Sequence, residues 1–187
     1  MRTFIAIELG NPIKDALSRL QSELNKSEAD VKWVLPENIH LTLKFLGEVK
    51  EEEMPEIIQS LKKIAREVNS FRVEINAIGA FPNAKSPRVI WSGIEQGKEN
   101  LSQLAGLVED ALERLEFPRE ERKFSAHITI GRVRSPKNRA ALSEAMQQLK
   151  FDALSQTVKS IILFKSSLTP KGPIYEKLDE ENLKSSS

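Results

Sequence analysis

The stretch His127-Ile128-Thr129-Ile130 has a counterpart earlier in the chain, His40-Leu41-Thr42-Leu43. These segments hold the only two histidines of the 187 residues, and each histidine is followed two positions later by one of only five threonines. A coincidence of two rare residue types at one spacing is a poor explanation for the match. The pair of segments therefore predicts a shared site.

Both segments alternate apolar and polar residues, and this period is typical of a β-strand with one buried face. Residues two apart share a face of a strand, so each histidine is expected beside its threonine. The same alternation places Lys44 on the His40 face and Phe45 on the buried face of Leu41 and Leu43. It places Arg132 away from His127, unless a bulge or strand end at Gly131 turns it back.

The rest of the chain reads as strands and amphipathic helices in alternation. Strands are expected at 3–7, 31–34, 39–46 (ended by Gly47), 71–77, 88–91, 124–133, 158–164 and 174–178, with helices after Asn11, Glu52, Leu101 and Ser135. Corresponding positions in the two halves, such as His40 and His127, are separated by 87 or 88 residues. We therefore expect one bilobal domain with an internal duplication, its halves at about 1–82 and 83–178. A polar tail at 179–187 is expected to fray.

Composition excludes several classes of protein. The chain has a formal net charge of +1 and no cysteine, so neither disulfides nor thiolate metal sites are possible. No apolar run is long enough to span a bilayer, and the N-terminus lacks the features of a signal peptide. We expect a cytoplasmic monomer that does not associate with a membrane and that binds neither a metal ion nor a cofactor.

Two imidazoles that face each other suit concerted acid–base catalysis, because at neutral pH one ring can be protonated and the other neutral. Threonine hydroxyls would donate hydrogen bonds to phosphate oxygens. The chain has no Gly-x-Ser-x-Gly elbow, no local zinc spacing and no glycine loop that cradles phosphate. The residues therefore favour metal-independent phosphodiester chemistry.

These motifs resemble the two-histidine (2H) phosphoesterases, whose signature is a pair of His-x-Thr-x segments. The flanks are similar to those of the RNA 2′,3′-cyclic phosphodiesterases, also called 2′-5′ RNA ligases; they are Arg2-Thr3-Phe4-Ile5-Ala6-Ile7, Val31-Lys32-Trp33-Val34, Pro36-Glu37-Asn38, Lys44-Phe45-Leu46-Gly47 and Gly131-Arg132. The resemblance covers most of the chain, from Arg2 to about Leu178. It implies a bilobal α+β fold, with helices outside two antiparallel sheets that flank a cleft.

The resemblance also implies an RNA-processing phosphoric diester hydrolase that converts an RNA or nucleotide 2′,3′-cyclic phosphate end to a 2′-phosphomonoester. His40 would be the proton donor and His127 the proton acceptor, with Thr42 and Thr129 holding phosphate oxygens. Three further residues are candidates for substrate binding: Arg132 and Lys44 through their charge, and Phe4 through stacking on a base, although core packing is the commoner role of such an aromatic residue.

Two alternatives stay open at this stage. The first is the reverse reaction, which joins a 2′,3′-cyclic phosphate to a 5′-hydroxyl and needs the same groups. The second is a non-catalytic nucleotide- or RNA-binding module that has kept the cleft.

Overall fold

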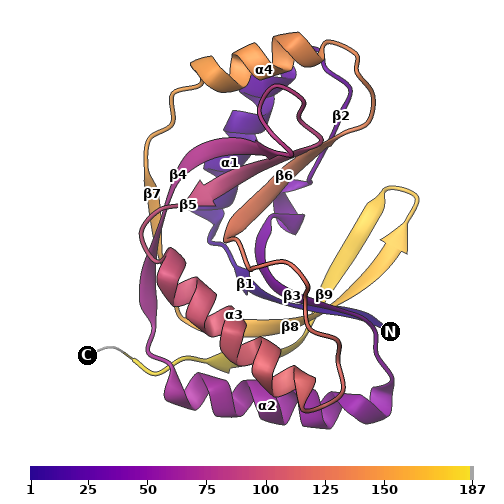
Figure 1. Cartoon of the computed structure of the whole chain (residues 1–187), viewed down its shortest axis with the longest axis vertical. Coiled ribbons are helices and arrows are strands. Elements are labelled where there is room, and N and C mark those ends of the chain that lie inside the picture. The colour runs from indigo at the N-terminus through magenta and orange to yellow at the C-terminus, as the bar shows by residue number, and fades with distance from the viewer. Residues whose placement is uncertain (186–187) are drawn as a thin grey trace.

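The structure, a computed structural model, describes residues 1–185. Its strands are β1 (Arg2–Glu8), β2 (Val31–Trp33), β3 (His40–Glu48), β4 (Phe71–Phe81), β5 (Val89–Ile94), β6 (His127–Val133), β7 (Leu154–Val158), β8 (Ser160–Thr169) and β9 (Gly172–Asn182). Its helices are α1 (Asn11–Asn25), α2 (Met54–Glu67), α3 (Lys98–Glu113) and α4 (Arg139–Gln148), with short 3₁₀ helices η1 (Pro36–Asn38) and η2 (Glu51–Glu53). The arrangement is shown in Figure 1.

The strands form two antiparallel sheets. The first has the order β3-β1-β8-β9, and the second has the order β2-β6-β5-β4-β7. Each sheet therefore combines strands from the beginning and the end of the chain. The strand predicted at 158–164 becomes β8, which lies in the interior of the first sheet as its apolar sequence requires.

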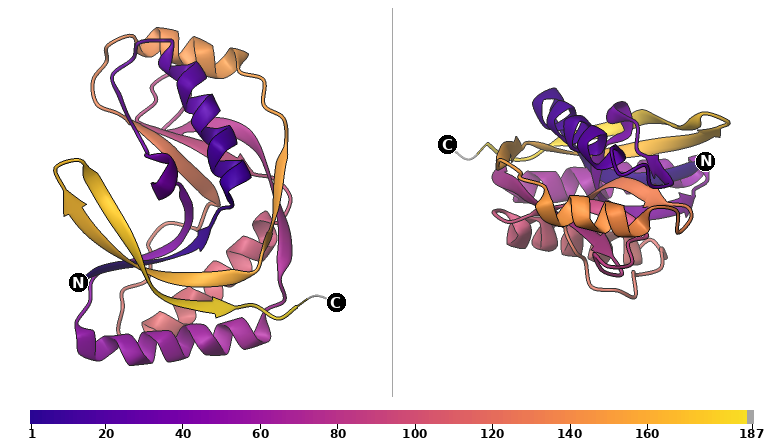
Figure 2. Two further views of the ribbon diagram at one scale, coloured as in Figure 1. Left: turned by 180° about the vertical axis from the view of Figure 1, so that it is seen from behind. Right: turned by 90° about the horizontal axis from the view of Figure 1, so that it is seen from above.

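The helices lie on the outside of the two sheets. Figure 2 shows α1 and α4 together at one end of the molecule, and α2 and α3 at the other. Helix α1 contacts β6, whereas α3 contacts β3 and α2 contacts β8 and β9. The apolar faces of both His/Thr strands enter this helix-covered core, and Leu41, Ile128 and Ile130 are fully buried there. The mixed α/β class with two antiparallel sheets is confirmed.

Several expected boundaries were wrong. Gly47 does not end β3, because it adopts a positive φ of 71° at a bulge and the strand continues to Glu48. The tail does not fray from residue 179, since residues 179–182 pair with β8 and Leu183 is buried. Residues 186–187 lie outside the described part. The short strand β7, which pairs with β4, was not predicted. The proposed duplication and its boundaries stay a prediction.

Candidate active site

His40 is the first residue of β3, and its ring is held by the backbone just before the strand. Its Nδ1 lies 2.6 Å from the carbonyl oxygen of Asn38. A carbonyl can only accept, so Nδ1 carries the proton and Nε2 is the atom left for chemistry. Nε2 lies 2.8 Å from the hydroxyl oxygen of Thr42, on the same face of the strand. The expected His/Thr face is therefore present.

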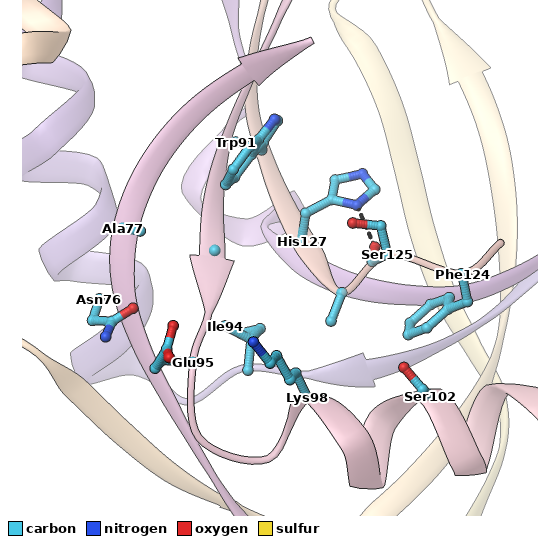
Figure 3. A pocket seen from close by; sticks show the side chains of 12 residues that line it. Asn76, Ala77, Trp91, Ile94, Glu95, Lys98, Ser102, Phe124, Ser125 and His127 are labelled. Carbon is cyan, nitrogen blue, oxygen red and sulfur yellow. Dashed lines mark hydrogen bonds between the residues drawn. The ribbon is translucent and has the colours of Figure 1, made fainter. Parts of the chain in front are cut away.

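His127 is the first residue of β6 and is held in the same manner. Its Nδ1 lies 2.7 Å from the carbonyl oxygen of Ser125, again two residues before the histidine (Figure 3). Thr129 follows two positions later, while Ile128 between them is fully buried. Both histidines thus have Nδ1 engaged by the backbone and Nε2 directed to the polar face.

Both strands carry a β-bulge at the corresponding place. In β3, Lys44 pairs with Ile5 and Thr42 with Ala6, which leaves Leu43 unpaired. In β6, Gly131 pairs with Ile90 and Thr129 with Trp91, which leaves Ile130 unpaired. An unpaired residue shifts the alternation by one, so residues beyond each bulge change faces.

The bulge in β6 decides the position of Arg132. It brings this side chain onto the face of His127 and Thr129. This is the predicted alternative in which a bulge near Gly131 turns Arg132 back toward the histidine. Gln21 of α1 supports the bulge, because its Nε2 donates to the Ile130 carbonyl at 2.9 Å and to the Val34 carbonyl at 2.8 Å. Sequence reasoning missed Gln21, a buried polar residue on an otherwise apolar helix face.

The bulge in β3 reverses the prediction for Lys44, which does not lie on the His40 face. Its side chain is 2 % exposed, and Nζ donates to Glu109 Oε1 at 2.8 Å and to the Pro118 carbonyl at 2.9 Å. Lys44 therefore joins β3 to α3 and to the segment after it. The geometry gives it no contact with a substrate bound at His40.

The same bulge exchanges the expected roles of two aromatic residues. Phe45 was expected in the core, but it lies on the His40 face and is 59 % exposed. Phe4, the candidate for stacking on a base, is 3 % exposed and packs against His40 with 4.8 Å between ring centroids. Phe4 therefore supports the imidazole and has no free face for a nucleobase.

Tyr175 of β9 completes the surroundings of His40 and was not found from the sequence. Its ring meets His40 edge to face at 5.2 Å and Phe4 at 4.9 Å. Burial raises the pKa of the Tyr175 phenol, and the positive charges of Arg132 and Arg2 oppose that effect. Arg132 belongs to the second sheet and Tyr175 to the first, so a positive charge of one sheet acts on a side chain of the other. The two histidine-bearing strands, β3 and β6, also contact each other.

Burial sets the electrostatic environment of His40. Burial lowers the pKa of His40 below its ordinary value, with a smaller contribution from the charge of Lys14. The hydrogen bond to Asn38 acts in the opposite direction but does not reverse the shift. His40 is therefore more readily neutral than an exposed histidine.

A cavity of about 350 Å³ opens beside His127. Figure 3 shows the His127 ring above it, with Lys98 and Ser102 of α3 at its floor and Trp91 along one side. Of the two histidines, His127 lines this cavity and His40 does not. Within residues 1–185, no group of three or more His, Asp or Glu side chains is arranged to hold a metal ion.

The fold and the paired strands define a class of phosphoesterase. The sequence profile of the family described as LigT like phosphoesterase matches residues 7–91 and 93–175. The chain belongs to this family of the two-histidine superfamily, as its motifs predicted. It is accordingly an enzyme of the phosphoesterase class, which disfavours the alternative of a non-catalytic module.

Particular relatives refine this placement. The chain is 37 % identical over 180 residues to an RNA 2′,3′-cyclic phosphodiesterase of Methanothermobacter thermautotrophicus, covering 96 % of this chain and 97 % of the relative. It is also 37 % identical to a protein of the same name from Thermotoga maritima, covering 96 % and 94 %.

Solved structures of similar proteins have the same fold. A crystal structure of a Thermus thermophilus protein matches with a TM-score of 0.82 and 30 % identity over 100 % of both chains. The structure of E. coli LigT with 3′-AMP matches with a TM-score of 0.77 and 26 % identity over 97 % of both chains. No helix in residues 1–185 is long and apolar enough to cross a membrane.

Proposed function

We propose that this protein hydrolyses 2′,3′-cyclic phosphate ends of RNA to 2′-phosphomonoesters by acid–base catalysis between His40 and His127, without a metal ion. The observation that carries the proposal is the matched orientation of the two rings. In each, Nδ1 is engaged by the carbonyl oxygen two residues earlier, so both Nε2 atoms are reserved for the substrate. The names of the relatives support the choice of substrate.

The reaction divides between the two imidazoles. Nε2 of His127 accepts a proton from water as the water oxygen attacks phosphorus. The bond between phosphorus and the 3′ oxygen breaks, and Nε2 of His40 gives its proton to that oxygen. The products are a 2′-phosphomonoester and a free 3′-hydroxyl, and the two imidazoles exchange their protonation states.

Three further side chains would stabilise the charge that grows on the phosphoryl oxygens. The hydroxyls of Thr42 and Thr129 donate hydrogen bonds to the two oxygens outside the ring. For Thr42, this contact replaces its present hydrogen bond to His40. Arg132, turned to the same face by the bulge at Ile130, adds a positive charge.

The low pKa of His40 has to be reconciled with its role as proton donor. Burial favours the neutral ring in the free protein. A bound phosphodiester carries a negative charge, which raises the pKa of a neighbouring imidazole. Substrate binding would therefore help to protonate the donor, and the site would be set for catalysis only when it is occupied.

The decisive experiment combines product analysis with variants. The purified protein is incubated with a 2′,3′-cyclic nucleotide and a chelator, and the monophosphate isomer is identified. We expect the 2′ isomer, with a rate lower by orders of magnitude in His40→Ala and in His127→Ala. Thr42→Val should also be slow, whereas Thr157→Val, a change at an exposed threonine of β7, serves as the matched control.

Near-normal rates in folded His40→Ala or His127→Ala would contradict the scheme, as would activity that is lost with the chelator. The same groups serve the reverse reaction by microscopic reversibility. Adding an RNA with a 5′-hydroxyl end therefore shows whether a 2′-5′ linked product accumulates.

A further inference from the structure

The catalytic face of the second sheet is hollowed directly beside His127. Residues that pair across antiparallel strands point their side chains to the same face of the sheet. His127 pairs with Gly93 of β5, and Gly93 pairs with Ala77 of β4. The row that begins with the imidazole therefore continues with a residue that has no side chain and then with a single methyl group. The cavity of about 350 Å³ lies over these two small residues.

Trp91 gives this cavity an aromatic wall. It pairs with Thr129 on one side and with Gly79 on the other, so its indole shares the catalytic face. A Cβ at Gly79 would overlap the indole, and a Cβ at Gly93 would come within 3.0 Å of it. Glycine at both positions thus lets the indole lie close against the sheet, along one side of the cavity (Figure 3).

The remaining lining indicates an uncharged ligand with hydrogen-bonding edges. Lys98 and Glu95 both line the cavity, and their opposite charges balance. Asn76 and Ser102 add an amide and a hydroxyl (Figure 3). An aromatic wall with a few polar groups and balanced charge suits a nucleoside better than a free phosphate. The volume is within the range of sites for small organic molecules.

The proposed reaction decides which nucleoside this is. His127 takes a proton from the attacking oxygen, and His40 gives one to the departing 3′ oxygen. In a displacement at phosphorus the attacking and departing oxygens lie roughly in line, on opposite sides of the phosphorus atom. The ribose that holds the departing oxygen therefore lies toward His40, and the group that carries the attacking oxygen lies toward His127. Since the cavity adjoins His127 and not His40, it belongs to the attacking side.

We propose that this cavity binds a nucleoside with a free 5′-hydroxyl, the 5′ end of a second RNA, whose base packs along Trp91. The inference rests on the proposed function, because it adds a second substrate to the same pair of histidines. Nε2 of His127 accepts the proton of the 5′-hydroxyl as the 5′ oxygen bonds to phosphorus. The bond from phosphorus to the 3′ oxygen breaks, and Nε2 of His40 protonates that oxygen. The product is a 2′-5′ linkage, and no water is consumed.

The test supplies 2′,3′-cyclic AMP together with the dinucleotide ApA, which has a free 5′-hydroxyl. The measured quantity is the ratio of the 2′-5′ linked trinucleotide to 2′-AMP. An effect that both reactions share, such as a displaced histidine, cancels in this ratio. The dinucleotide pApA, whose 5′ oxygen carries a phosphate, should give no trinucleotide.

Two variants alter the cavity without touching either histidine. Trp91→Leu removes the aromatic wall, and we expect the ratio to fall about 5- to 100-fold, the usual range for a lost stacking contact. Ala77→Leu fills the cavity from an exposed position and should abolish the trinucleotide. Ala141→Leu, the same change at an exposed position of α4, is the matched control.

Two results would overturn the inference. If the unaltered protein forms only 2′-AMP, and excess ApA does not slow that hydrolysis, no acceptor binds beside His127. If folded Trp91→Leu or Ala77→Leu keeps the ratio of the unaltered protein, the acceptor does not lie in this cavity. Where ApA slows hydrolysis without being joined, relief of that inhibition in Ala77→Leu supports the site. Failure of the proposed function is distinct, because the unaltered protein would then not open 2′,3′-cyclic AMP at all.

Discussion

Replacing Lys44 separates a structural role from a role in substrate binding. Its Nζ is paired with Glu109 at 2.8 Å, and the two side chains are only 2 % and 15 % exposed. Lys44→Met removes the charge and leaves the Glu109 carboxylate, among residues 1–185, with one hydrogen-bond donor, the Glu120 N–H at 3.3 Å. Removing one partner of a buried pair costs about 3–5 kcal/mol. Because water reaches part of Glu109, we expect about 3 kcal/mol of lost stability, from the lower end of that range.

Thermal unfolding measures this loss. For a protein of this size, about 3 kcal/mol corresponds to a Tm lower by roughly 6–12 °C. The double variant Lys44→Met/Glu109→Leu should recover most of it, because no uncompensated charge stays buried. Lys26→Met, which breaks the exposed pair with Glu23, is the control and should change stability by less than about 1 kcal/mol.

The competing interpretation makes a different prediction. If Lys44 bound phosphate in the cleft, Lys44→Met would leave Tm unchanged and raise KM, and the difference from the unaltered protein would shrink at high salt. That result would refute the reasoning from the bulge at Leu43.

Three further predictions follow from the site. With His40 as donor, kcat/KM should decline on the alkaline side with a pKa below about 6.5, because burial lowers the His40 pKa in the free enzyme. The alkaline limb of the kcat profile should lie at higher pH than that of kcat/KM. If the two limbs coincided, substrate binding would not raise the pKa of His40. The contribution of the neutral His40 ring to folding stability should be fully present above about pH 6.5 and should be lost as the pH decreases through the folded His40 pKa. Urea titrations at several pH values should show a smaller pH dependence for His40→Gln. Gln21→Ala removes one buried and one partly buried hydrogen bond, so we expect about 2–3 kcal/mol lower stability by urea unfolding. We also expect a lower kcat/KM as the bulge that directs Arg132 loosens, and an unaltered kcat/KM would show that Arg132 needs no such support.

The strands and their polar faces could be predicted because alternation is a local property. His40 and Thr42 share a face for the same reason that Leu41 is buried, and a short stretch of sequence is enough to show it. The family followed from the same short segments. The residues up to each bulge were therefore placed correctly.

The faces beyond the bulges could not be predicted in the same way, since a bulge depends on how a strand pairs with its partner. For β6, Gly131 was a usable signal, because a Cβ there would come within 2.8 Å of the Trp33 ring. For β3, the corresponding residue is Lys44, and its partner Glu109 is 65 residues away. No local sequence pattern predicts an ion pair between residues that far apart in the chain.

The exchange of strands between the two sheets limits how the molecule can move. The chain passes from one sheet to the other between β1 and β2, β2 and β3, β3 and β4, and β7 and β8. Four covalent crossings restrain the sheets from swinging apart as two bodies on a single hinge. Cutting the chain between residues 82 and 88 would leave each fragment with strands that lack their neighbours. Neither fragment could therefore form by itself a complete sheet with its histidine-bearing strand.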